Sequence, residues 1–528
     1  MPAGPPELDP RRWLSLGVLL IGLFMSLLDT TIVNVALPTI RSSLHANEAT
    51  QAWIVSGYAL AFGIALIPAG RVGDRFGHKR IFVTGLVIFT LSSLACGLSH
   101  NSAELVIARV IQGLGGGIFF PAVSSLIQIM IPLRERGRAF GLLGATIGLA
   151  TALGPLAGGL LIEAFGNTDG WRSIFFVNLP VGVIAVAAAL AVLPGTALAK
   201  KLSTDLLGLL LAAGALAALL VPLIEGQEDG WPLWTYLSMA GAVVLFALFA
   251  FWERRVARGT GEPLVPPHLF SRLSFTGGVS LSLVYFASFS SIFYTVSLLW
   301  QAGLRHSALA SGLVSVPFSA GIIASSSQSG RVVQRLGRAV LSIGTGLLAV
   351  GLIALWIVIR EVPTQELTNW DLLGPLFVIG AGSGFFISPN VRFILATVSR
   401  PEVGAASGVN GTMQRIGAAI GVAIVSSVLY GALPATFTPG KAQIAQITRQ
   451  YLQAGPAAIK QAITNAAYRN LAVAYGHGAA DALLVSAGLA VAAFLLVFAL
   501  PRQAALPGPP PAAREAIPEP GPAENSKS

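Results

Sequence analysis

The chain alternates between long apolar runs and short polar segments. An apolar helix of about twenty residues crosses the roughly 30 Å of hydrocarbon in a bilayer. The pattern therefore predicts an all-α integral membrane protein with fourteen transmembrane helices. The runs lie near residues 13–38, 51–69, 81–99, 103–130, 138–163, 172–193, 205–224, 235–252, 274–300, 308–328, 339–359, 372–394, 404–430 and 479–500.

A short basic segment occurs twice between these runs. Gly70–Arg80 reads GRVGDRFGHKR, and 260 residues later Gly330–Arg338 reads GRVVQRLGR. A repeat at corresponding places predicts two related six-helix bundles, with two extra helices between them. We expect a cytoplasmic N-terminus at 1–12, bundles at 13–195 and 263–502, and a two-helix insertion at 196–262. The second bundle includes an outer loop at 431–478, in which residues 441–471 are weakly amphipathic and predict one or two surface helices. A disordered tail follows at 503–528.

Composition and charge support this interpretation. Charged residues make up 11% of the chain, against about 25% in soluble domains. With both termini inside, 23 of the 33 Lys and Arg residues fall on the inner side and 8 on the outer side. Inner loops of membrane proteins carry such an excess. We therefore expect a multi-pass protein of the cytoplasmic membrane with both termini in the cytoplasm. This rule explains the net charge of +10 better than a nucleic-acid partner does.

Two ionisable residues lie deep inside predicted spans. Asp29 is about seventeen residues into the first span, roughly 25 Å along the helix. The low dielectric constant there disfavours a charged carboxylate, which suits a group that binds and releases a proton. Arg109 lies at a comparable depth in the fourth span and needs a partner. We predict a proton-coupling pair of Asp29 and Arg109. A fixed tie between two helices, a neutral Asp29 or an Arg109 that reaches the outer surface are the alternatives.

The fifth span is rich in glycine. Small residues spaced four apart let helices approach closely, and a proline inside a helix removes a backbone donor and bends it. We therefore expect a close helix contact with a bend at Pro155. The residues of this predicted motif are Gly144, Gly148, Gly154, Pro155, Gly158 and Gly159.

The repeated basic segment predicts a conformational latch. Its glycines permit tight turns, and Asp74 can bind the positive N-terminal end of a neighbouring helix or an arginine. Contacts that form in one conformation and break in another make a latch. Plain inner-loop charge explains the basic residues but not Asp74. The predicted latch residues are Gly70, Asp74, Arg75, Gly77 and Arg80.

Polar and aromatic side chains inside several spans predict the walls of a substrate cavity. The ninth span combines aromatic and hydroxyl residues, and the thirteenth carries two amides and an arginine at helical spacing. Aromatic residues in spans also face lipid or other helices, which is the alternative for each of them. The predicted cavity residues are Asn34, Trp53, Tyr58, Gln112, Tyr285, Phe289, Asn410, Gln414 and Arg415.

These segments together resemble the major facilitator superfamily, in particular its fourteen-span drug:proton antiporter branch. The resemblance rests on Leu28–Pro38, Gly70–Arg80, Arg109–Gly117, the glycine-rich fifth span through Gly159, and Trp171–Gly182. It implies two bundles around a central cavity, alternating access, and export driven by inward proton flow. It also implies coupling roles for Asp29 and Arg109. The chain departs from the pattern at Gln334, where the second segment lacks an acid, so the second latch is expected to be weaker or absent.

Several functions remain to be distinguished. An exporter of drugs or other amphiphiles is the first, and a dedicated exporter of one endogenous lipid or metabolite is the second. We found no acid in the second, tenth, twelfth or thirteenth predicted spans, whereas some members of the family that the chain resembles export cations and carry extra acids. The resemblance therefore disfavours dicationic substrates and favours neutral, monocationic or amphiphilic ones. The six scattered histidines and the single cysteine give no metal spacing or catalytic cluster, so a membrane enzyme is disfavoured and neither metal nor cofactor is expected. The chain has no phosphate-binding GxxxxGK[ST] segment of an ATP-driven pump. We expect a monomer.

Overall fold

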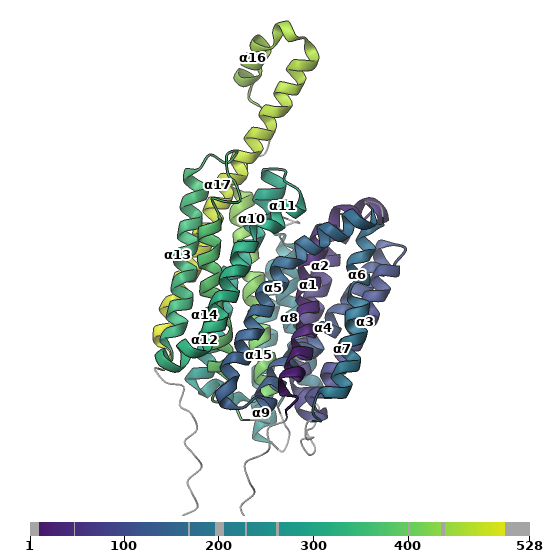
Figure 1. Ribbon diagram of the computed structural model, residues 1–528, viewed down its shortest axis with the longest axis vertical. Helices are drawn as coiled ribbons and strands as arrows, with labels where there is room; N and C mark the ends of the chain where they lie inside the picture. The colour runs from purple at the N-terminus through teal and green to yellow at the C-terminus, as the bar shows by residue number, and fades with distance from the viewer. Residues whose placement is uncertain are drawn as a thin grey trace, which may run out of the picture.

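The computed structural model describes residues 10–46, 48–166, 169–195, 205–226, 230–259, 263–399, 402–433 and 439–501. These residues form helices and connections, with no strand among them. Thirteen of the helices are long and apolar enough to cross a membrane. A further helix, α5 (Leu133–Phe165), spans 33 residues and lies among them (Figure 1). The all-α membrane fold is therefore confirmed, while the count of fourteen spans remains a prediction.

The first bundle contains the helices before residue 195. They pack as neighbouring pairs, with α2 and α3 against α4, α1 against α5, and α7 beside α1 and α3. Helix ends follow local sequence: Asn101 caps α4 by accepting the Glu104 N–H at 2.9 Å, and Gly77 separates α2 from α3 at φ 92°, a conformation that favours glycine. The helices are α1 (Arg12–Leu44), α2 (Glu48–Phe76), α3 (His78–Leu98), α4 (Ser102–Met130), α5, α6 (Ser173–Phe176) and α7 (Asn178–Val192).

The second bundle repeats this arrangement. In it, α10 packs against α15, α12 packs against α14, and α13 lies between α14 and α17. The two bundles stand side by side in Figure 1. The helices are α10 (Leu273–Leu298), α11 (Ala308–Val314), α12 (Val316–Leu336), α13 (Ala339–Glu361), α14 (Leu373–Leu395), α15 (Val403–Gly431), α16 (Lys441–Gln450) and α17 (Pro456–Ala499).

The last helix differs from its predicted bounds. We expected a span at 479–500 after an outer loop, but α17 is one helix of 44 residues that begins at Pro456. At 1.5 Å per residue it is about 66 Å long, twice the hydrocarbon thickness. Its first part and α16 project beyond the bundles at the top of Figure 1. The predicted start was wrong because hydropathy locates only the part of a helix that lies in lipid. Alanine-rich polar sequence can continue the same helix beyond the membrane boundary.

The two inserted helices cover one side of the junction between the bundles. Helix α8 (Leu206–Glu225) packs against α2 of the first bundle and α15 of the second. Helix α9 (Leu233–Arg258) packs against α8 and has only 11% of its most apolar window buried within the protein. It is therefore the outermost helix. The predicted tail at 503–528 lies outside the described residues, as do residues 1–9 and 196–204 of the predicted N-terminus and insertion.

Candidate functional site

A buried carboxylate lies at the centre of the first bundle. Asp29 of α1 has no exposed surface. Its Oδ2 accepts a hydrogen bond from Arg109 Nη1 of α4 at 2.5 Å, and its Oδ1 accepts from Gln112 Nε2 at 3.0 Å and from Asn178 Nδ2 at 3.1 Å. A buried charge needs a partner and hydrogen bonds. The structure thus brings Asp29 of α1 into direct contact with Arg109 of α4, although the two residues are 80 positions apart in the sequence.

The guanidinium of Arg109 joins three helices. Besides Asp29 on α1, its Nε–H donates to the Ile54 carbonyl of α2 at 3.1 Å and its Nη1 donates to Gln112 at 2.8 Å. Its guanidinium carbon lies 4.2 Å from the centre of the Tyr58 ring, which is a cation–π contact. The planar guanidinium uses several donors at once. A change of charge at Asp29 therefore affects the contacts of both α2 and α4.

Glycines of α4 set these distances by letting α2 approach. A Cβ atom added to Gly113 would lie 2.3 Å from the Tyr58 carbonyl oxygen, and one on Gly117 would lie 2.4 Å from that of Phe62. No side chain fits in either place. The glycine-rich sequence that follows Arg109 therefore holds α2 against α4, with Tyr58 beneath the guanidinium.

A second carboxylate connects the two bundles. We call the end of the molecule that carries the Gly70–Arg80 segment the loop end; α16 lies at the opposite end (Figure 1). There, Asp74 of α2 accepts hydrogen bonds from the backbone N–H groups of Gly404 and Ala405 at 3.0 and 3.1 Å. These residues open α15, where free N–H groups and the helix dipole attract an anion. A Cβ on Gly70 would lie 2.1 Å from the Gly404 oxygen. The predicted latch acid thus bridges the bundles.

The same contact recurs across the other side of the junction. Gly330 of α12 corresponds to Gly70 in the repeat, and a Cβ there would lie 3.0 Å from the Gly137 carbonyl carbon of α5. The next turn of each helix makes a similar contact. A Cβ added to Gly408 of α15 would lie 2.6 Å from the Leu66 oxygen, and one added to Gly141 of α5 would lie 2.7 Å from the Ser326 oxygen. The pairs α2–α15 and α12–α5 are therefore equivalent. We call these two contacts together the seam.

Helix α5 has two different neighbours along its length. Its first half lies against α12 of the second bundle, where a Cβ on Gly148 would meet Ile322 at 2.0 Å. Gly144 faces Ser326 and Ser388 in the same way. Its second half lies against α1, where a Cβ on Gly154 would be 1.8 Å from Thr31 Oγ1 and one on Gly158 would be 3.0 Å from Ile32. The change of partner falls near Pro155. The predicted bend at Pro155 and the part assigned to Gly159 stay predictions.

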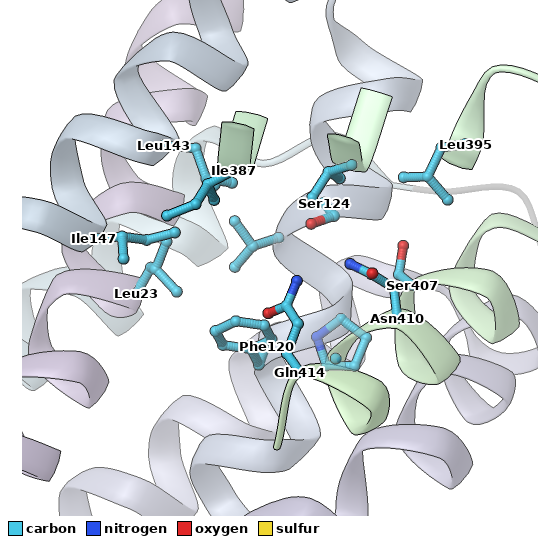
Figure 2. A pocket seen from close by; sticks show the side chains of 14 residues that line it. Leu23, Phe120, Ser124, Leu143, Ile147, Ile387, Leu395, Ser407, Asn410 and Gln414 are labelled. Atoms are coloured by element: carbon cyan, nitrogen blue, oxygen red, sulfur yellow. The ribbon is translucent and has the colours of Figure 1, made fainter. Parts of the chain in front are cut away.

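A pocket lies between the bundles on the loop-end side of the centre. It is a narrow space that is partly open to solvent. Figure 2 shows the amide of Asn410 on the side of Ser407 and Leu395, the apolar side chains of Leu23, Leu143 and Ile147 on the opposite side, and Gln414 beside Phe120. An apolar lining with a few polar groups is typical of small-molecule sites. The lining residues are Leu23, Phe120, Pro121, Val123, Ser124, Leu143, Ile147, Ile387, Val391, Leu395, Ser407, Asn410, Gly411 and Gln414.

The remaining predicted cavity residues lie elsewhere in this conformation. Trp53 borders a smaller space of about 150 Å³ beside α8. Tyr58 and Gln112 belong to the Asp29 network, because each contacts Arg109. Tyr285 is fully buried within the second bundle.

Two more predicted cavity residues pack inside the protein. Phe289 packs beside Tyr285, with ring centres 5.9 Å apart. Arg415 stacks on Phe62, with 4.2 Å between guanidinium carbon and ring centre. The side chain of Asn34 lies outside the described part of the chain. Substrate contact by the whole set remains a prediction.

Sequence reasoning missed two site residues. Asn178 of α7 donates to Asp29 and also to Ser93 Oγ at 3.1 Å; the available signal was an amide at the start of an apolar run. His78 lies with Nε2 3.2 Å from Asp74 Oδ1, and its spacing of four residues from Asp74 was the signal.

The other latch residues lie around the bridge that Asp74 forms, with Gly70 directly against Gly404. Gly77 forms the turn at φ 92°, Arg80 is exposed, and the guanidinium of Arg75 lies 4.7 Å from the Phe76 ring centre. Metal binding finds no support in the described residues, where no group of three or more His, Cys, Asp or Glu side chains is suitably placed.

Comparison with known sequences places residues 19–422 within the model of the Major Facilitator Superfamily. The chain is 36% identical to the probable actinorhodin transporter of Streptomyces coelicolor over 82% of this chain and 74% of that protein. It is 33% identical to multidrug resistance protein Stp of Mycobacterium tuberculosis strain H37Rv, over 79% and 76%. It is 31% identical to the tetracenomycin C resistance and export protein of Streptomyces glaucescens, over 79% and 76%.

Solved structures share the fold. The human organic anion transporter MFSD10 superposes with a TM-score of 0.61 at 15% identity, covering 93% of this chain and all of that one. The proton:xylose symporter XylE superposes with a TM-score of 0.57 at 16% identity, covering 90% and 94%. At such identities the likeness concerns the fold alone. Together the comparisons confirm the family resemblance and the prediction of a transporter rather than an enzyme.

Proposed function

This chain belongs to the Major Facilitator Superfamily, and we propose that it is a proton-coupled exporter that moves drugs or other amphiphilic small molecules out across the cytoplasmic membrane. The observation that carries the proposal is the Asp29–Arg109 pair, a fully buried carboxylate bound by a cation that also holds α2. Intramembrane ionisable groups mark ion and substrate pathways. The names of the related proteins support drugs or antibiotics as the substrate class.

The pair supplies a way for a proton to act on the fold. Protonation of Asp29 would remove the negative charge and leave the Arg109 guanidinium buried without a counter-charge. Removing one partner of a buried ion pair costs about 3–5 kcal/mol. Because Arg109 also contacts Ile54 and Tyr58 of α2, the least costly response is a movement of α2 relative to α4 and α1. Proton binding would thus be converted into a change of helix packing.

Alternating access would then open and close the seam. The loop end is closed in this structure, with Asp74 on the first turn of α15 and Gly137 against Gly330. A protein in which the loop end faces the cytoplasm, as the Lys and Arg distribution predicts, would here be shut toward the cytoplasm. Opening would break the two hydrogen bonds of Asp74 and separate α5 from α12. The pocket behind the seam would then admit a molecule from the inside.

A dedicated exporter of one compound is the second candidate. The names of two relatives, a probable actinorhodin transporter and a tetracenomycin C export protein, each specify one product. Both candidates share the coupling chemistry and differ in substrate breadth.

The test uses the purified protein in liposomes that hold a pH-sensitive dye, with an imposed proton gradient. Unrelated lipophilic compounds are added one at a time, with protein-free liposomes as the control. Collapse of the gradient by several of them supports a multidrug antiporter. Collapse by one chemical family only supports a dedicated exporter, and substrate movement that never alters the gradient contradicts proton coupling.

A further inference from the structure

The two halves of the seam differ at one position that faces the interior. On α5 the close contacts are made by Gly137, Gly141, Gly144 and Gly148, and on α15 the same spacing gives Gly404, Gly408, Gly411 and then Arg415. Both series lie against equivalent helices. Gly148 packs on Ile322, and Arg415 stacks on Phe62, which precedes Ile322 by the repeat distance of 260 residues. Arg415 of α15 therefore occupies the position that corresponds to Gly148 of α5 in the repeat.

Arg415 has no carboxylate partner among the described residues. Its guanidinium stacks on the Phe62 ring. The buried acid of the first bundle, Asp29, is already bound by Arg109. Arg415 of α15 lies between the two bundles, over Phe62 of α2, and keeps part of its surface accessible.

An interior guanidinium without a counter-charge is costly, and one cation–π contact offsets only part of that cost. A side chain kept in such a place needs a reason outside the protein's own contacts. The neighbouring residue Gln414 lines the pocket between the bundles. Phe62, on which Arg415 stacks, packs against Phe120 of the pocket wall, with ring centres 5.4 Å apart. The cation is therefore next to the space in which a substrate would lie.

We propose that Arg415 binds an anionic group of the exported molecule, a carboxylate or an ionised phenol, while the apolar body of that molecule lies in the pocket beside Gln414 and Phe120. The proposal rests on the proposed export function and narrows its substrate class to acidic amphiphiles. A guanidinium matches a carboxylate with two parallel hydrogen bonds. If one proton enters for each monoanion exported, two positive charges move inward per cycle, so an inside-negative membrane potential assists export.

The test measures binding without any proton gradient. Two fluorescent probes share one apolar body and differ only in charge: 1-pyrenebutyrate and its neutral amide. Each is titrated against the purified full-length protein in lipid nanodiscs. We expect the wild-type protein to bind the carboxylate about tenfold more tightly than the amide, as a charge-assisted hydrogen bond provides. Arg415→Gln should remove this preference and leave binding of the amide unchanged.

Two further variants separate the proposal from a structural role. Arg415→Lys keeps the charge and should keep a reduced preference, while Arg449→Gln alters an exposed arginine of α16 and should behave as wild type. A wild-type protein that binds both probes equally, or neither, overturns the proposal. So does an Arg415→Gln variant that loses both probes to the same extent. Failure of proton coupling in liposomes would leave the binding preference intact, so the two proposals fail separately.

Discussion

At the scale of single residues, the Asp29 site is a small polar network whose members depend on one another. Asp29 receives hydrogen bonds from Arg109, Gln112 and Asn178, so two helices, α4 and α7, supply donors to one carboxylate. Hydrogen bonds to a charged group are stronger in a medium of low dielectric constant than in water. Any export cycle that uses Asp29 as a proton site therefore has to break these hydrogen bonds.

The contacts of Arg109 predict that the planar shape of its side chain is needed in addition to its positive charge. Arg109→Lys preserves the positive charge beside Asp29, but an ammonium group cannot also donate to the Ile54 carbonyl and to Gln112 from the same planar fork. We expect export by the reconstituted variant to fall about tenfold or more, the effect of losing one or two charge-assisted hydrogen bonds. The measurement is the initial rate of substrate-dependent proton flux.

Normal export by Arg109→Lys would show that charge alone is required at this position. Equal amounts of monodisperse protein by gel filtration serve as the control for folding.

Sequence reasoning found Asp29 and Arg109 because depth within a span makes a charge conspicuous. Their contact, expected as one of several alternatives, is what the structure shows. Asn178 escaped notice because a neutral amide carries no comparable signal, and only the fold brings α7 to α1. Gln112 was assigned to a cavity wall, yet its amide serves Asp29 and Arg109. One face of a helix can serve either purpose, and the sequence does not distinguish them.

At the scale of helices, α5 links the hydrogen-bond network of Asp29 to the seam between the bundles. Its second half touches α1 at Thr31 and Ile32, two and three residues after Asp29, and its first half lies in the seam against α12. A displacement of α1 beside Asp29 would therefore reach the interface between the bundles through α5. This gives the glycine-rich sequence a physical role that its resemblance alone does not supply.

The tight contact of Gly154 makes this role testable. Gly154→Ala places a methyl group 1.8 Å from Thr31 Oγ1, which forces α1 and α5 apart at a cost of about 1–3 kcal/mol. We expect export to be largely lost while the protein still inserts in the membrane. Gly488→Ala, on α17 with no atom within 4 Å of the added carbon, is the matched control and should export normally. Equal rates for both variants would contradict the account of α5.

The Asp74 bridge predicts a kinetic effect. Asp74→Asn keeps the size of the side chain but removes the charge that interacts with the first turn of α15. We expect turnover to fall several-fold with substrate affinity nearly unchanged, because Asp74 lies outside the pocket lining. Rates measured over a range of substrate concentrations separate the two quantities. Weakened affinity at normal turnover would argue against a latch.

The element scale also shows why part of the fold was missed. The repeat was found in the basic segments because identical letters recur at one spacing. Its second part, the glycines of α5 and α15, has the spacing of many membrane helices, so only the contacts with Ser326 and Leu66 reveal that the two series correspond. The extension of α17 was missed because hydropathy reports the membrane boundary and not the end of a helix.

At the scale of the whole molecule, the structure is closed at the loop end on both sides of the junction. The α2–α15 side is covered by α8, which touches both helices, and the α5–α12 side depends on direct glycine contacts. The insertion therefore lies where it can follow the relative movement of the bundles. Its helix α9 contacts mainly α8 and does not share in the seam.

A cross-link across the seam tests whether this closure belongs to the transport cycle. Gly137→Cys with Gly330→Cys places one cysteine on each side of the seam, where an added Cβ on either residue would lie about 3 Å from the backbone of the other; a small separation of α5 and α12 brings the two thiols to disulfide geometry. The one native cysteine, Cys96, is buried and should not interfere. Oxidation is expected to stop export and reduction to restore it.

The single-cysteine variants should be unaffected by either treatment. Undiminished export by a fully cross-linked protein would show that the bundles need not separate at the loop end.

The most direct test of the account concerns Asp29 itself. Wild-type protein and Asp29→Asn are reconstituted in parallel liposomes with a pH-sensitive dye inside, and a compound exported by the wild type is added under an imposed proton gradient. Asparagine keeps the hydrogen-bonding shape but neither binds nor releases a proton. We expect substrate-dependent collapse of the gradient with the wild type and none with Asp29→Asn, although the variant is folded and still binds the compound. Proton flux at the wild-type rate from Asp29→Asn would contradict the assignment of Asp29 as the coupling group.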